Sequence, residues 1–161
     1  MSQTTIERLY AAFERLDGAA MQACYAPDAR FDDPVFSLQG REQIGGMWRM
    51  LCQAGREHSR GVWRLSVGAA RPLGQGWALR WEVDYRFGAT GRAVHNVVHT
   101  EIELDADGLI LRHRDRFDFW RWSRQALGAP GLLLGWTGLL RRRVQQTAAL
   151  GLTRFLARPP P

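Results

Sequence analysis

The chain has 161 residues, 45% of them hydrophobic, so it is long enough for one domain with its own core and too apolar to be disordered. Its net charge of +6 comes from 22 Arg without any Lys. The excess lies wholly in residues 112–161, with no zinc-finger, helix-turn-helix or RNA-binding signature, so no nucleic-acid partner is expected. Cys24 and Cys52 fit no disulfide or metal-ligand spacing, which predicts reduced core thiols in a cytoplasmic protein.

The N-terminal third is predicted to be mainly helical. Apolar residues recur at helical spacing in "TTIERLYAAFERL", residues 4–16, and the pair Asp17-Gly18 ends that helix. A short helix is expected at about 19–25. A turn at "APDA" and an extended segment at 30–36 follow, before a third helix at about 41–54.

The middle of the chain is predicted to form strands. Residues 77–87 alternate cleanly, so Trp81, Val83 and Tyr85 face one way while Arg80 and Glu82 face the other. Further strands are expected at 62–67, 93–104 and 109–119, with turns at "GATGR" and "DADG". Helices followed by an antiparallel meander predict the α+β class.

The C-terminal tail combines apolar and basic residues. Within 131–157 one helical face carries Leu133, Trp136, Leu140, Val144, Ala148, Leu152 and Phe155. Arg141, Arg142 and Arg143 stand together in the middle of this segment. We expect a helix packed on the sheet or on a second subunit. The alternative is a basic amphipathic helix that makes weak contact with an anionic membrane surface.

"FDDPV", residues 31–35, places two carboxylates side by side. In an extended segment Phe31, Asp33 and Val35 share one face, so Asp33 is predicted to point towards the core and Asp32 towards water. Burial among apolar groups raises the pKa of a carboxyl, as a base that removes a proton from carbon near neutral pH requires. The alternative is structural, because Asp before Pro often caps a turn.

The order of elements around "YAPDARFDDPV" resembles the NTF2-like superfamily, which includes ketosteroid isomerases and SnoaL-like polyketide cyclases. The resemblance implies a cone over residues 1–120: a curved antiparallel β-sheet wrapped around three N-terminal helices. Residues 121–161 would be a C-terminal amphipathic helical extension. It also implies a homodimer and chemistry without a cofactor or metal.

The same resemblance suggests roles for single residues. Asp33, directly before Pro34, matches the isomerase Asp that carries the proton, and Tyr10 in "LYAAF" matches the oxyanion-hole Tyr. The division of roles between an Asp base, a Tyr and a protonated Asp is the known one of ketosteroid isomerase. The position of that protonated Asp falls on Thr100, a weaker hydrogen-bond donor, so this sequence departs from the isomerase pattern there.

The last predicted strand adds polar residues to the pocket face. Its alternation points His113, Asp115 and Phe117 inward, which predicts either a second acid/base pair or a structural ion pair. Arg112 and Arg114 point outward, which argues against the Asp-Arg-Asp set of the epoxide hydrolases that share this fold. His95 and His99 share the outer face, and about 13 Å of strand separates them, too far for one metal ion.

These observations predict an enzyme that uses acid/base chemistry on a small hydrophobic carbonyl compound, as an isomerase or a cyclase. Asp33 would remove the proton, and Tyr10 with Thr100 or His113 would stabilise the enolate. Asp115 would orient His113 or act as the acid. The apolar pocket is expected to include Phe13, Phe31, Trp48, Trp81, Asn96 and Phe117. The alternative is a non-catalytic module that binds a small ligand.

Overall fold

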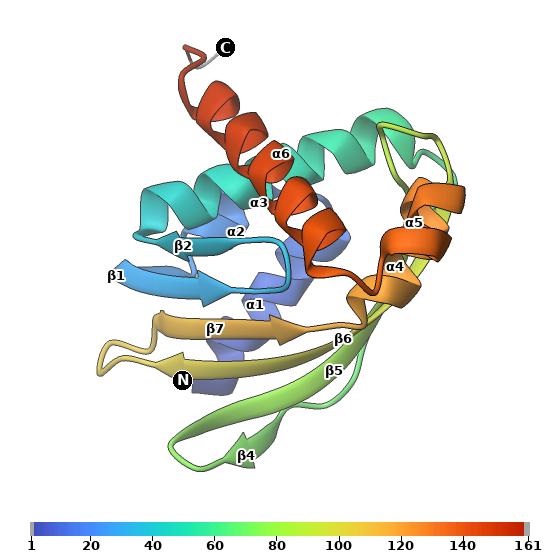
Figure 1. Ribbon diagram of the computed structural model, residues 1–161. Coiled ribbons are helices and arrows are strands. Elements are labelled where there is room, and N and C mark those ends of the chain that lie inside the picture. Colours follow the sequence, from blue (N-terminus) through green and yellow to red (C-terminus); the bar gives the residue numbers. More distant parts are fainter. Residues whose placement is uncertain (1, 160–161) are drawn as a thin grey trace.

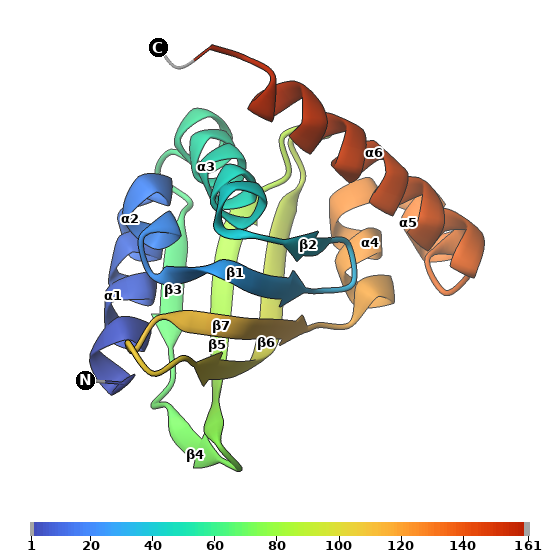
Figure 2. The same cartoon turned by 90° about the vertical axis from the view of Figure 1, so that its left-hand side faces the viewer.

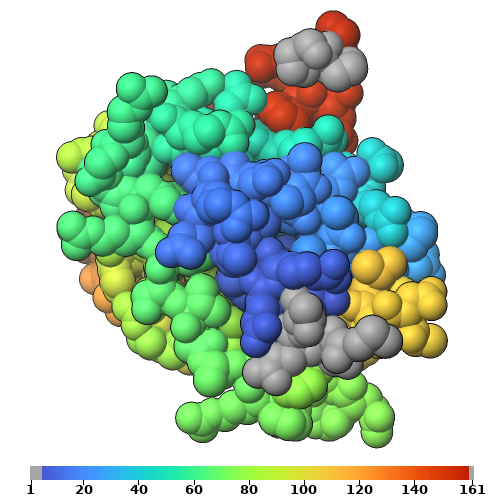
Figure 3. Space-filling model, turned by 180° about the vertical axis from the view of Figure 1, so that it is seen from behind, coloured from blue at the N-terminus to red at the C-terminus, as the bar shows by residue number. Residues whose placement is uncertain are grey.

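The computed structural model describes residues 2–159 as a curved sheet with helices packed against it (Figure 1). The three expected N-terminal helices are present. They are α1 (Ser2–Glu14), α2 (Gly18–Gln22) and α3 (Arg41–His58). Seen from behind, these helices lie next to one another across the middle and upper part of the molecule (Figure 3). The predicted α+β cone is confirmed.

The sheet contains seven strands. They are β1 (Tyr25–Asp32), β2 (Ser37–Gln39), β3 (Arg64–Val67), β4 (Arg71–Leu73), β5 (Gly76–Arg86), β6 (Ala93–Leu104) and β7 (Ile110–Arg116). Their order is β2-β1-β7-β6-β5-β3, and β4 also pairs with β5. The alternation predicted for β5 and β6 holds, since Trp81, Val98 and Thr100 are buried while Arg80 and His99 are exposed.

The first strand differs from the prediction. The segment "APDA" was expected to be a turn, but it lies inside β1. This strand pairs in parallel with β7, so the sheet is not purely an antiparallel meander. The ladder is irregular between Tyr25 and Arg30, where Pro27 cannot donate a backbone hydrogen bond. The local sequence favours a turn at this position, but the long-range pairing of β1 with β7 makes it part of a strand.

Three helices follow the sheet, and the single helix expected over 131–157 is divided into two of them. The three helices are α4 (Phe119–Leu127), α5 (Ala129–Leu134) and α6 (Gly138–Leu156). The last strand ends earlier than predicted because Asp118 caps α4 by accepting the Arg121 N–H. Thr137 caps α6 in the same way, which interrupts the expected continuous face. Leu133 and Trp136 are consequently exposed, while Leu152 is buried.

The three C-terminal helices lie along one side of the molecule (Figure 2), and α6 crosses α3 and contacts it (Figure 1). Leu152 of α6 reaches the main core, and Ala148 packs beside it. A smaller cluster joins Phe119, Trp122 and Ala126 of α4 to Val94 of β6. Among residues 2–159, no helix has the length and apolar character needed to cross a membrane.

Candidate active site

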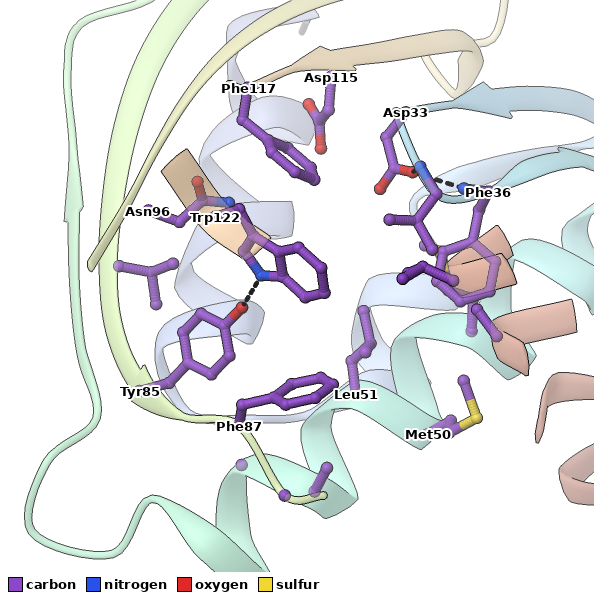
Figure 4. A pocket seen from close by; sticks show the side chains of 18 of the residues that line it. Asp33, Phe36, Met50, Leu51, Tyr85, Phe87, Asn96, Asp115, Phe117 and Trp122 are labelled. Atoms are coloured by element: carbon purple, nitrogen blue, oxygen red, sulfur yellow. Dashed lines mark hydrogen bonds between the residues drawn. The ribbon is translucent and has the colours of Figure 1, made fainter. Parts of the chain in front are cut away.

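A cavity of about 590 Å³ lies between α3, the inner face of the sheet and α6 (Figure 4). Its wall is mainly apolar. Eight of the residues predicted for the site line it: Phe13, Phe31, Asp33, Trp48, Trp81, Asn96, Asp115 and Phe117. A cavity of this size and character suits a small hydrophobic molecule.

Asp33 and Asp115 meet at one end of this cavity because of the β1–β7 register. Phe31 lies opposite His113, and Asp32 lies opposite Arg114. In parallel strands the next positions, Asp33 and Asp115, fall side by side just beyond the last pair. Figure 4 shows both carboxyl groups directed into the same space. A pairing between distant parts of the chain thus brings two acids together.

Asp33 is held by the turn that follows it. Its Oδ1 accepts hydrogen bonds from the backbone N–H groups of Val35 at 2.7 Å and Phe36 at 2.6 Å. The side chain therefore caps a turn, as the structural alternative expected, and at the same time lines the cavity. Desolvation raises the pKa of Asp33 to about 7 despite the lowering effect of these two bonds, and the charge of Asp115 adds to the rise.

Asp115 is buried, and two donors converge on its Oδ1. The Thr100 hydroxyl lies 2.5 Å from this oxygen and His113 Nε2 lies 2.8 Å from it. The Asp115 oxygen therefore acts as the acceptor at the end of both contacts. No described residue donates to the second oxygen of Asp115, which leaves that oxygen available to the cavity.

A chain of hydrogen bonds runs from Trp48 through Tyr25 and His113 to Asp115 and holds Asp115 in place. Trp48 Nε1 donates to the Tyr25 hydroxyl at 2.9 Å, and that hydroxyl lies 2.8 Å from His113 Nδ1. Burial raises the pKa of Tyr25 well above its ordinary value, so the phenol keeps its proton and can donate it to Nδ1. The His113 tautomer that satisfies every contact carries its proton on Nε2 and donates it to Asp115.

Three predicted residues do not line the cavity. Tyr10 and Trp81 both donate to the Thr100 hydroxyl, at 3.3 Å and 2.8 Å, and Thr100 donates onward to Asp115. Burial raises the pKa of Tyr10 well above its ordinary value, so it remains a phenol. Tyr10, Thr100 and His113 therefore stand behind Asp115 and do not face the space a substrate would occupy.

Sequence reasoning missed the pairing of Tyr85 with Trp122 in the cavity wall. Trp122 Nε1 donates to the Tyr85 hydroxyl at 2.7 Å (Figure 4). Burial raises the pKa of Tyr85 to about 12, and the charge of Asp33 contributes to the rise. The Tyr85 hydrogen has no acceptor among the described residues and is free for a ligand. Strand alternation pointed Tyr85 inward, but nothing local linked it to Trp122 on α4.

The C-terminal helix α6 forms part of the cavity wall and contacts the turn that follows Asp33. Leu140, Val144 and Ala148 line the cavity from this helix. The side chains of Arg141 and Gln145 both donate to the backbone carbonyl of Pro34, at 3.4 and 3.0 Å. These two hydrogen bonds therefore hold α6 against the turn that Asp33 caps.

A smaller cavity of about 310 Å³ reaches the same two carboxylates from outside. Its wall includes Arg114, Arg116 and Arg141 beside Asp33 and Asp115. The two acids thus separate an apolar space from a polar one. Arg112 and Arg114 are exposed, as the sequence predicted.

The outer face of the sheet carries ion pairs. His95 contacts Asp84 at 2.7 Å and Glu82 at 3.1 Å, and His99 is exposed. Within residues 2–159, no group of three or more His, Cys, Asp or Glu is arranged to hold a metal ion. Cys24 and Cys52 are free and buried.

Solved structures with the same fold come from several bacteria. A Catenulispora acidiphila protein with a ketosteroid isomerase-like fold, in complex with trimethylamine, is 17% identical over 85% of this chain and 99% of its own, with a TM-score of 0.65. An uncharacterised Silicibacter pomeroyi protein with a cystatin-like fold is 18% identical over 96% and 91%, with a TM-score of 0.62. A Mycobacterium tuberculosis LEH-like epoxide hydrolase is 18% identical over 82% and 92%, with a TM-score of 0.60.

Sequence comparison supports the same relationship. A comparison with curated protein sequences gives no match. The SnoaL-like domain, in contrast, matches residues 6–113, which is most of the chain and includes β1, Asp33 and most of the sheet. With this match and the shared fold, the chain belongs to the SnoaL-like family of the NTF2-like superfamily.

Proposed function

We propose that this protein is a cofactor-free acid/base enzyme that acts on a small hydrophobic carbonyl compound, as an isomerase or a cyclase. One observation carries the proposal: a carboxyl group with a pKa of about 7 stands at the end of an apolar cavity. A base with such a pKa is ionised in a large fraction of molecules at neutral pH and is still basic enough to remove a proton from carbon.

Asp33 is the base in this mechanism. Its Oδ1 is held by two backbone N–H groups, so Oδ2 is the oxygen that takes the proton next to the substrate carbonyl. The negative charge of Asp115 raises the proton affinity of Asp33. His113 and Thr100 act as positioning residues, because they hold Asp115 and do not touch the substrate.

The enolate oxygen requires a hydrogen-bond donor in the cavity wall. Tyr85 supplies one, because its hydrogen is free and the Trp122 N–H polarises its oxygen. Asn96 lines the same wall and offers an amide N–H. Tyr10, which resembles the oxyanion-hole Tyr, instead acts at one remove through Thr100. Return of the proton from Asp33 to a different carbon completes an isomerisation. In a cyclisation the enolate carbon attacks a second carbonyl, and the proton from Asp33 passes to the alkoxide that forms there.

The test is an ultraviolet assay for conversion of a β,γ-unsaturated ketone into its conjugated isomer. Wild type should convert the ketone, and Asp33→Asn should lose activity by a factor on the order of 10³ or more, because the base is removed. Asp32→Asn is the matched control, since Asp32 bonds to Ser37 and does not line the large cavity. Equal activity in wild type and Asp33→Asn would contradict the role of Asp33.

The apolar cavity also favours a second candidate, a non-catalytic module that binds a small ligand. The comparison protein that binds trimethylamine supports small-molecule binding in this fold. Binding of a hydrophobic fluorophore without turnover of any ketone in a panel would favour this alternative. Retained binding by Asp33→Asn would then place the affinity in the apolar wall.

A homodimer through the outer face of the sheet is part of the proposal, as the family resemblance implied. The ion pairs on that face, such as Arg116 with Glu101 at 3.2 Å, offer both charge signs for a symmetric contact. Sedimentation equilibrium measures the oligomeric state directly. A monomer at all concentrations would remove the dimer from the proposal and leave the chemistry unaffected.

A further inference from the structure

The helix α5 exposes the side chains that a packed helix normally buries. Its contact with α4 is made by glycine, since a Cβ on Gly131 would overlap the Ser123 carbonyl oxygen. Gly131 and Gly135 are buried, while the leucines between them are exposed. We call the resulting patch the apolar corner, and its members are Leu132, Leu133, Leu134, Trp136 and Leu139.

The apolar corner is larger than scattered surface hydrophobic residues would be. Trp136 is 72% exposed, Leu139 71% and Leu133 67%. The five residues come from α5, the following turn and the first turn of α6, which together form one edge of the molecule (Figure 2). Contiguous exposed apolar residues of this kind mark an interaction surface.

The chain segment that carries the apolar corner has charged residues of one sign only. Residues 119–161 hold seven Arg and no Asp or Glu. Arg141 and Arg142 lie two and three positions after Leu139 on α6, and Arg121 and Arg124 stand on α4, against which α5 packs. A partner that binds the apolar corner must therefore accommodate leucine and tryptophan side chains together with several guanidinium groups.

We propose that the apolar corner docks on the surface of an anionic lipid membrane. Exposed Leu and Trp enter the boundary between headgroups and acyl chains, and the arginines bind the lipid phosphates. A second copy of the chain fits less well, because a symmetric contact through this patch would bring the arginines of both copies together. The charge therefore favours a lipid surface over self-association.

This docking would place the cavity next to the lipid. Leu139 belongs to the apolar corner, whereas its neighbour Leu140 and Val144, one turn further on, line the cavity. The same helix thus faces the proposed membrane at its start and the cavity along its inner side. A lipophilic compound dissolved in the membrane would have a short path to Asp33.

The test is co-flotation of the full chain with lipid vesicles. Wild type should float with vesicles of phosphatidylcholine and phosphatidylglycerol but not with phosphatidylcholine alone, and high salt should weaken binding. Leu139→Ser and Trp136→Ser should each reduce binding on the order of tenfold, because each removes a large apolar side chain from the contact. Leu73→Ser is the matched control, since Leu73 is 52% exposed on the distant strand β4.

Circular dichroism verifies that each variant is folded. No binding by wild type, equal binding to both kinds of vesicle, or an equal loss in Leu73→Ser would each overturn the proposal. A dimer that Leu139→Ser dissociates would also overturn it, because a second copy would then cover the apolar corner. Ketone turnover plays no part in these measurements, so the outcome is separate from that of the proposed chemistry.

Discussion

Asp33 combines two roles that compete for the same carboxyl group. Its Oδ1 is fixed by two backbone N–H groups, which favour the charged form, while the apolar cavity disfavours it. Desolvation is the larger effect, and the pKa rises to about 7. The turn explains how the side chain is positioned, and the cavity explains why it is reactive.

The pH dependence of turnover follows from this pKa. Because Asp33 acts as a base only when ionised, kcat/KM for a ketone substrate should rise about tenfold per pH unit below pH 7 and level off above it. Initial rates between pH 5 and 9 measure the profile. A rate that is flat down to the ordinary pKa of an Asp would contradict a raised pKa in the free enzyme.

The same shift affects stability with a defined sign. A carboxyl whose folded pKa is raised stabilises the fold below its unfolded pKa, and this contribution is lost as pH rises through the folded pKa. Between pH 4 and 7, the free energy of unfolding of wild type should therefore fall by up to about 4 kcal/mol relative to that of Asp33→Asn. The amide oxygen of this variant still accepts both backbone hydrogen bonds. Urea unfolding at pH 5 and pH 8 measures the difference, and a pH-independent difference would contradict it.

Removing the hydroxyl group of Tyr85 or of Tyr10 distinguishes the roles of these two residues. Tyr85→Phe should reduce kcat by a factor on the order of 10² because it removes a donor from the cavity wall. Tyr10→Phe should have a much smaller effect, since its bond to Thr100 is long, at 3.3 Å, and Trp81 still donates to Thr100. Steady-state kinetics of both variants decide between them. A larger loss in Tyr10→Phe would return the oxyanion role to Tyr10.

At the scale of elements, the contact between α4 and α5 depends on glycine. Gly131→Ala should destabilise the protein by about 2 kcal/mol or more, because the added Cβ would overlap the Ser123 carbonyl oxygen and force the helices apart. Gly151→Ala, in α6, meets no atom within 4 Å and should stabilise the protein by roughly 0.5–1 kcal/mol. Thermal unfolding compares the two, and equal destabilisation would show that space at Gly131 is not the cause.

The elements differ in how far the sequence predicts them. The hairpin of β5 and β6 was predicted well because alternation within one strand reports its buried face, as at Trp81 and Thr100. The tail was predicted less well, since Leu-rich segments on both sides of Gly135 continue one helical pattern through a break that Thr137 caps. The fold class follows from such local patterns.

The site depends on contacts that no local pattern reports. Asp33 could be proposed from "FDDPV" alone, but its neighbour Asp115 follows from the parallel register of β1 and β7. Likewise, the pairing of Tyr85 with Trp122 joins a strand to a helix in the predicted extension. Side-chain direction along one strand is predictable, whereas the partner across the cavity is decided by tertiary packing.

At the scale of the whole molecule, the cavity wall draws on both ends of the domain. Phe13 comes from α1, Trp48 from α3, Val83 from β5 and Val144 from α6. A ligand that fills this space contacts elements that touch each other little elsewhere. Occupancy should therefore stabilise α6 together with the rest of the domain.

Hydrogen exchange with and without a hydrophobic ligand tests this linkage. At a ligand concentration one hundred times its Kd, the free energy of opening measured by hydrogen exchange should increase by up to about 2.7 kcal/mol. The increase should extend into residues 138–156. The outermost strand β4 makes no contact with the cavity and provides the internal reference. Protection confined to α3 and the sheet would mean that α6 does not cover the bound ligand.

The parallel pairing of β1 with β7 also governs when the site can form during folding. The hairpin of β5 and β6 joins neighbouring segments and can form early, whereas β1 must wait until almost the whole domain has been synthesised. Until then Asp33 is an ordinary solvated carboxylate with no Asp115 beside it. During refolding, recovery of the raised pKa and of activity should lag behind recovery of secondary structure, because the two carboxylates meet only when the sheet is completed.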